Sequence, residues 1–291
     1  MRQSRGKPRF FHRSFSEEEP PTTGIAARIL DPITGEVVTP KWTKPGTLRE
    51  NGVAGSISNR HRQLALAILC LGLGNCDFAM GSSIRQWIKE KDRTGAVGST
   101  ARSGTVRILN TEATNALHKE WNGAAGYVSS EYIDEGATPG ATYPLYGTAV
   151  RHEDLQATSF KDNSFDLVIT SEVFEHIPHP YTAHREILRI LKPGGKHIFT
   201  APFSGKEADT FFSQLRPDGS VVHPEWRQGK PLLHGDPVRP DQGTLVYTFF
   251  GEEMLAKLCT MGYNARAFEI YSPLHGIRGA GAIVFEAENP Q

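Results

Sequence analysis

This sequence contains few cysteines and has no excess of charge of either sign. It holds three cysteines, Cys70, Cys76 and Cys259, and none of them forms a Cys-x-x-Cys pair. A sparse, odd set is typical of a reducing compartment and argues against a disulfide scaffold or a zinc finger. Lysine plus arginine and aspartate plus glutamate both number 32, so the formal net charge is 0. The balance gives no electrostatic reason to expect a nucleic acid or an anionic membrane as partner.

Long apolar runs are also missing. The longest, LALAILCLGLG at residues 64–74, is far short of the roughly 20 residues that cross a bilayer. The first residues do not show the basic-then-apolar layout of a secretory signal. We therefore expect a cytoplasmic protein without a membrane partner.

The composition divides the chain into segments. Residues 1–58 are rich in proline, glycine, threonine and charge, which predicts an irregular or disordered N-terminal extension. Residues 59–104 contain two helical patterns and predict a helical segment that packs on the core. Residues 105–291 then form one domain, with a long excursion rich in glycine, proline and histidine at about 204–248. Excursions of that length are usually lids or binding loops.

Apolar strand patterns alternate with helical patterns from residue 105 onward. This alternation predicts an α/β fold with a mostly parallel sheet and helices on both faces. The carboxyl ends of such strands share one rim, where ligands bind. After the excursion come a helix and two strands joined by a glycine-bearing turn, which predicts an antiparallel hairpin. The strands are expected at 105–111, 125–132, 148–155, 165–172, 196–203, 264–272 and 281–289.

The most patterned stretch is FKDNSFDLVITSEVFEHI…EILRILKPGGKHIFTAPF, at residues 160–203. A strand that begins with Phe-Asp is followed by a Glu-His pair and by a helix that ends in Leu-Lys-Pro-Gly-Gly. In this order and spacing the stretch resembles the class I S-adenosylmethionine-dependent methyltransferases. The resemblance runs roughly from Thr105 to Glu288. It implies a Rossmann-like sheet of seven strands with an antiparallel last strand, S-adenosylmethionine as cofactor, and methyl transfer as activity.

The resemblance also assigns cofactor contacts at the strand ends. Glu131, followed by Tyr132, fits the acid that accepts hydrogen bonds from the ribose hydroxyls, because a carboxylate offers two acceptors and no competing donor. Asp154 fits the acid near the adenine amino group, and the backbone of Leu155 would face the ring. The alternative for both acids is an exposed residue at a strand end.

The next strand end supplies the remaining part of the implied site. Ser171 and Glu172 would line the methionine end of the cofactor. His176 is a candidate for catalysis, since a neutral imidazole can take a proton near pH 7. Glu175 beside it is either part of the site or a structural charge at a helix start.

The first strand departs from the family. Where the family has an acid followed by three glycines, this chain has Asn110, Thr111, Glu112 and Ala113. The glycines normally let the backbone approach the cofactor closely. S-adenosylmethionine carries no phosphate, so a phosphate-binding nest is not required, and Glu112 could serve its cationic groups. Two interpretations stay open: a divergent cofactor pocket or an empty one.

The excursion carries His223, Glu225, Trp226, His234 and Asp236. We expect a lid over a substrate pocket, with His223 as a second candidate base. A plain structural loop is the next interpretation, and a metal site ranks last because the spacing matches no compact ligand motif. No metal ligands are therefore assigned from the sequence.

We expect methyl transfer to the oxygen, nitrogen or carbon of a small molecule. The alternative is a methyltransferase-like protein that transfers no methyl group and acts as a binding or regulatory partner, or uses the cleft for another reaction. A nucleic-acid methyltransferase is disfavoured by the zero net charge and by the absence of an Asn/Asp-Pro-Pro-aromatic motif after the fourth strand, where the chain reads SEVF.

Overall fold

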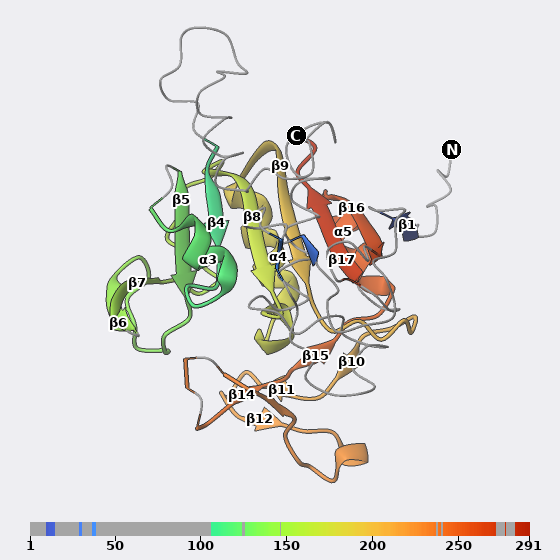
Figure 1. Ribbon diagram of the computed structural model, residues 1–291. Coiled ribbons are helices and arrows are strands. Elements are labelled where there is room, and N and C mark those ends of the chain that lie inside the picture. Colours follow the sequence, from blue (N-terminus) through green and yellow to red (C-terminus); the bar gives the residue numbers. More distant parts are fainter. Residues whose placement is uncertain are drawn as a thin grey trace, which may run out of the picture.

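A mixed sheet forms the centre of the computed structural model (Figure 1). The structure describes residues 10–14, 29–30 and 37–38 and, from 106 onward, all residues except 124–125, 146, 237, 240, 272–276 and 278–282. The helical segment expected at 59–104 lies outside the described residues. So does most of the expected extension 1–58, of which three short strands are described.

The sheet has nine strands, and seven of them follow the expected plan. β17 is antiparallel to both β9 and β16, whereas β5, β4, β8 and β9 run parallel to one another. The prediction of a mostly parallel sheet with an antiparallel last strand is therefore confirmed. The strands in spatial order are β1 (Phe10–Ser14), β16 (Asn264–Tyr271), β17 (Ile283–Glu288), β9 (Leu191–Thr200), β8 (Phe165–Ser171), β4 (Ile108–Asn110), β5 (Tyr127–Glu131), β7 (Thr148–His152) and β6 (Thr142–Leu145).

Two edge strands extend this plan. β1 pairs parallel to β16 although it comes from the N-terminal extension, and β6 pairs antiparallel to β7 within a stretch where we expected no strand. A further pair, β2 (Ile29–Leu30) and β3 (Val37–Val38), forms a separate two-stranded ladder.

β8 is the most buried strand of the sheet. Leu167, Val168 and Ile169 are fully buried, as expected for a central parallel strand that is covered on both faces. Asp166 is the exception. Its carboxylate accepts hydrogen bonds from the backbone N–H of Arg107 at 2.8 Å and from Nζ of Lys192 at 2.7 Å. The carboxylate of Asp166 therefore joins β8 to Arg107, just before β4, and to Lys192, near the start of β9.

Helices cover both faces, as predicted. α4 (Pro180–Ile190) and α5 (Glu253–Met261) share one apolar cluster with Leu109, Val168 and Phe199. α3 (Ala116–Trp121) packs on the other face, because Trp121 lies edge-on against Tyr127, which stands opposite Ile108 in the sheet. Figure 1 shows α3 and α4 on opposite sides of β4 and β8. Among the described helices, none has the length and apolarity needed to span a membrane.

The Lys-Pro-Gly-Gly segment differs from expectation. We expected it to be a turn between a helix and a strand that begins at residue 196, but α4 ends at Ile190 and β9 begins directly at Leu191. The pairing jumps from Phe165–Leu191 to Leu167–Lys196, so the extra residues bulge out of the strand. Glycine is needed here, since Gly194 has a φ of +73° and a Cβ on Gly195 would lie 2.8 Å from the carbonyl oxygen of Lys192.

A fully buried histidine lies on the inner face of α4. The ring of His184 stacks on Phe174 with 4.0 Å between centroids, and neither ring nitrogen has a hydrogen-bond partner. Burial lowers the pKa of His184 to about 3. The unfolded chain takes up a proton near pH 6.5, whereas the folded protein does not, so stability is lost as the pH falls below that value.

We expect His184→Leu to reduce the acid sensitivity of the fold. Between pH 7 and pH 5 the buried His184 should cost the natural protein about 2 kcal/mol of unfolding free energy that the variant does not lose. Urea unfolding at the two pH values measures the difference. An equal loss in both proteins would show that His184 is not the group responsible.

Candidate active site

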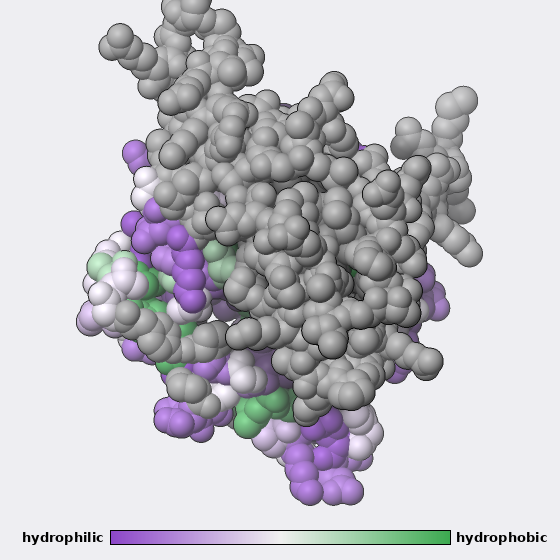
Figure 2. Space-filling model, viewed as in Figure 1, coloured by the Kyte–Doolittle hydropathy of each residue, from purple (hydrophilic) through white to green (hydrophobic). Residues whose placement is uncertain are grey.

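A long insertion, residues 204–248, covers the rim at which the parallel strands end (Figure 1). We expected a loop, and the structure builds it instead from short antiparallel ladders: β10 (Thr210–Phe211) with β15 (Thr248–Phe249), β11 (Gln214–Leu215) with β12 (Val221–Val222), and β13 (Leu233–His234) with β14 (Thr244–Leu245), together with the short helix η4 (Glu225–Arg227). Figure 2 shows this lower part of the molecule as mostly hydrophilic with a smaller hydrophobic patch. Its role as a lid stays a prediction.

A cleft of about 490 Å³ lies between this insertion and the strand ends. Its volume is within the range of small-molecule and cofactor sites. The ends of β4, β5, β7 and β8 supply one wall, and the insertion supplies the other with Leu215, Asp236, Arg239, Leu245 and Tyr247 among its lining residues.

Most of the expected site residues line this one cleft. They come from four different strand ends that the sequence places up to 65 residues apart, from Thr111 to His176. Three expected residues do not line it: Asn110 and Ser171 are buried at the ends of β4 and β8, and His223 is hydrogen-bonded to the hydroxyl of Ser213 within the insertion. Those that line it are Thr111, Glu112, Glu131, Tyr132, Asp154, Leu155, Glu172 and His176.

Glu131 ends β5 with its carboxylate in the cleft. Oε1 accepts a hydrogen bond from the backbone N–H of Ala113 at 2.8 Å, which leaves acceptor capacity on the other oxygen. Burial raises the pKa of Glu131 to about 8, although the hydrogen bond from Ala113 acts in the opposite direction. The site therefore holds a carboxyl group whose charged form is poorly solvated and would gain from new donors.

Asp154 follows the neighbouring strand β7. Its Oδ1 accepts a hydrogen bond from the backbone N–H of Gln156 at 2.8 Å, which closes a tight turn at the rim. Leu155, within that turn, is 6% exposed and lines the cleft. The turn presents an acid and adjacent backbone on the same wall as Glu131.

The turn after β4 does without glycine. None of residues 110–115 has a positive φ, so no residue there needs glycine's conformational freedom. Nδ2 of Asn110 lies within hydrogen-bonding distance of the carbonyl of Glu112 (3.0 Å), Oδ1 of Asn115 (3.2 Å) and the hydroxyl of Tyr127 (2.9 Å). Asn115 in turn caps α3 by accepting from the N–H of His118. Hydrogen bonds from side-chain amides thus stabilise this turn, whereas the methyltransferases that the sequence resembles have glycines at these positions.

Glu172 has an unusual backbone at the rim. Its φ of +54° lies in the left-handed region, and among the described residues only Asn163 and Gln228 share this feature without being glycine. Such conformations are uncommon for a longer side chain and cluster at functional sites. The backbone N–H of Glu172 donates to the carbonyl of Thr200, which holds the residue at the cleft wall.

Sequence reasoning did not single out two of the insertion's contributions. Asp236 and Arg239 form an ion pair at 2.8 Å, and Nη1 of Arg239 donates to the carbonyl of Ile133 at 3.4 Å. Arg239 thereby joins the insertion to the segment after β5. No spacing in the sequence indicates this contact.

His176 connects the core to the insertion. It belongs to the short helix η3 (Phe174–His176) after β8, and its Nδ1–H donates to the backbone carbonyl of Leu245 in β14 at 2.8 Å. The backbone N–H of Tyr247 donates to the carbonyl of the neighbouring Glu175 at 2.7 Å. The two contacts hold the insertion against the strand ends.

Comparison with known proteins adds the following. A family model described as a methyltransferase domain matches residues 127–199. An uncharacterized methyltransferase of Mycobacterium avium is 28% identical over 170 residues, and one of Mycobacteroides abscessus is 26% identical over 174 residues; each match covers 52% of this chain and 64% of the relative. The chain thus spans less than two thirds of the length of these relatives. A solved structure of an S-adenosylmethionine-dependent methyltransferase from Mesorhizobium loti matches 65% of this chain and 93% of its own, with 18% identity and a TM-score of 0.38.

We expect Asn110→Asp to destabilise the protein, although it restores the family's acid. The change removes the amide donors and places a carboxylate against the oxygen atoms of Glu112 and Asn115, which should cost about 2 kcal/mol or more. Urea unfolding measures the loss. The matched control is Asn163→Asp, at an exposed position, and equal stability of the two variants would contradict the bracing role of Asn110.

Proposed function

We propose that the chain is a class I S-adenosylmethionine-dependent methyltransferase that transfers the methyl group of S-adenosylmethionine to a small-molecule acceptor. The observation that carries the proposal is the pair of acids Glu131 and Asp154 on one wall of the cleft, at the ends of the adjacent strands β5 and β7.

The lining fits the cofactor's chemistry. Glu131 would accept hydrogen bonds from the ribose hydroxyls, and Asp154 with the backbone of Leu155 would bind the adenine. The turn that contains Thr111 and Glu112 would hold the methionine end. Seven carboxylate side chains and one arginine line the cleft, which favours a cofactor with a cationic sulfonium and amino group. When bound, the cofactor supplies an electrophilic methyl group on sulfur.

The protein's own contribution is positioning. The strand ends hold one reactant and the insertion covers the other side, so the two are kept at reacting distance and water is excluded. The acidic lining favours a neutral or cationic acceptor over an anionic one. Of the two histidines expected as bases, His176 lines the cleft and His223 does not. Because Nδ1–H of His176 is bound to Leu245, its Nε2 is the nitrogen with a lone pair.

The glycine-free turn after β4 favours one alternative, which is binding of the cofactor product or another nucleoside without methyl transfer. Incubation with labelled S-adenosylmethionine and a panel of small amines and alcohols, followed by mass spectrometry, separates the two. Methylated product supports transfer, whereas tight cofactor binding without any product supports the alternative.

We expect S-adenosylhomocysteine to bind with micromolar affinity and Glu131→Gln to weaken binding about tenfold or more, since a charged acceptor is replaced by a neutral amide. Isothermal titration calorimetry measures both. The control Glu225→Gln changes an exposed carboxylate outside the cleft and should bind like the natural protein. Absence of binding at millimolar ligand would contradict the proposal.

Cofactor binding should also release a proton. At pH 7 a group with a pKa of about 8 is mostly protonated, and hydroxyl donors favour the ionised carboxylate, so binding lowers this pKa and expels the proton. The measured enthalpy at pH 7 should therefore depend on the ionisation enthalpy of the buffer. The dependence should be smaller at pH 9 and absent in Glu131→Gln; a persistent dependence in that variant would assign the proton to another group.

A further inference from the structure

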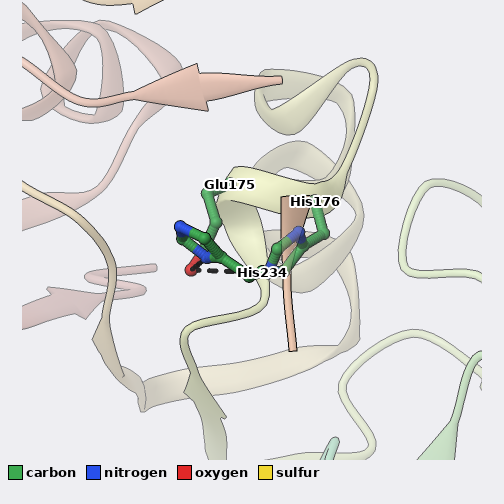
Figure 3. A group of neighbouring side chains, drawn as sticks. All are labelled: Glu175, His176 and His234. Carbon is green, nitrogen blue, oxygen red and sulfur yellow. Dashed lines mark ion pairs between the residues drawn. The ribbon is translucent and has the colours of Figure 1, made fainter. Parts of the chain in front are cut away.

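The side chains of Glu175, His176 and His234 meet beside the cleft, and we propose that they bind a divalent first-row transition metal ion. Glu175 and His176 lie on η3 of the core, whereas His234 lies on β13 of the insertion. Figure 3 shows the three side chains turned toward one another. The sequence analysis names these residues in two separate places, and no ligand spacing joins residues 175 and 234.

The distances suit a shared ion. Nε2 of His176 is 3.6 Å and Nδ1 of His234 is 3.7 Å from the same oxygen, Oε1 of Glu175. One ligand atom from each residue lies within 4.8 Å of the others. Ligands about 2.1 Å from a tetrahedral zinc ion are roughly 3.4 Å apart. The two separations between carboxylate and imidazole are therefore within a few tenths of an ångström of those in such a site.

Burial of Glu175 favours a cation nearby. Its side chain is fully buried, and neither carboxylate oxygen has a hydrogen-bond partner among the described residues. An ionised carboxylate without donors is among the most costly groups to bury. The two neighbouring imidazoles do not form hydrogen bonds to it, since both nitrogens lie beyond 3.5 Å. A bound ion would supply the missing partner.

The hydrogen bonding of His176 sets the ring for ligation. Its Nδ1–H donates to the carbonyl of Leu245, so the Nε2 lone pair faces the carboxylate of Glu175. Two electron-rich atoms facing each other repel unless a cation lies between them. A backbone carbonyl that accepts from the far nitrogen is the usual support of a metal-bound histidine.

The ligand types decide the class of ion. Two imidazole nitrogens and one carboxylate oxygen suit zinc, manganese or ferrous iron, whereas magnesium and calcium prefer sets made of oxygen alone. Three protein ligands leave at least one coordination position open. Because His176 also lines the cleft, that position is accessible to a small ligand there.

Such an ion would tie the insertion to the core. His234 is the ligand from the insertion, and its strand β13 pairs with β14, which carries the carbonyl that holds His176. The ion would also occupy the lone pair that a general base needs, so metal ligation and proton abstraction are alternative roles for Nε2 of His176. This inference does not depend on S-adenosylmethionine binding.

The test titrates Zn²⁺ and Co²⁺ into the untagged full chain after dialysis against a chelator. We expect one equivalent to bind with micromolar affinity or tighter, and the midpoint of thermal unfolding to rise with metal concentration. His234→Ala should weaken binding at least tenfold. His223→Ala is the matched control, since it removes the insertion's other histidine, which is hydrogen-bonded to Ser213, and should bind like the natural protein.

The near-ultraviolet and visible spectrum of bound Co²⁺ identifies the ligands. Bands of a nitrogen- and oxygen-ligated ion support the proposal, whereas an intense thiolate charge-transfer band places the metal on cysteine and overturns it. No binding at 100 µM metal, or equal binding by His234→Ala, overturns it as well. Circular dichroism and urea unfolding check that His234→Ala is folded, and Glu175→Gln, which keeps the shape of the side chain, provides a second variant with the same expected loss.

Discussion

The parallel register of four neighbouring strands determines where the chemistry of this protein can lie. β4 pairs with β5 and β8 so that Ile108 stands beside Tyr127 and Leu167, and β5 pairs with β7 so that Glu131 stands beside His152. This register brings the segments after all four strands to one edge. A slip of one residue would turn Glu131 to the opposite face of the sheet and remove it from the cleft.

The sequence allowed the rim, but not its cover, to be predicted. The rim could be predicted because strand patterns are local and parallel strands align their ends by a general rule. The family resemblance then assigned Glu131, Asp154 and Glu172 to it. The proximity of His234 to Glu175 depends on how β13 and β14 fold back on η3, and no local pattern encodes that contact. The edge strand β6 was missed for a similar reason, since Thr142–Leu145 alternates only weakly and includes a proline.

The turn after β4 shows how one structural need can be met by different chemistry. Glycine permits a tight turn through its backbone freedom, whereas Asn110 and Asn115 stabilise one through side-chain hydrogen bonds while the backbone stays in ordinary conformations. A motif search that asks only for glycine misses this solution. An asparagine network is less tolerant of change, because each amide serves several partners at once.

The position of β17 has a consequence for the order in which the sheet can form. This strand follows all the other described strands in the chain, yet it lies between β9 and β16. Until residues 283–288 leave the ribosome, β16 and β1 have no hydrogen-bonded connection to the rest of the sheet. From the synthesis of β9 until residues 283–288 emerge, the growing chain therefore exposes an apolar strand edge on β9, including Phe199, and unpaired edges are prone to wrong associations.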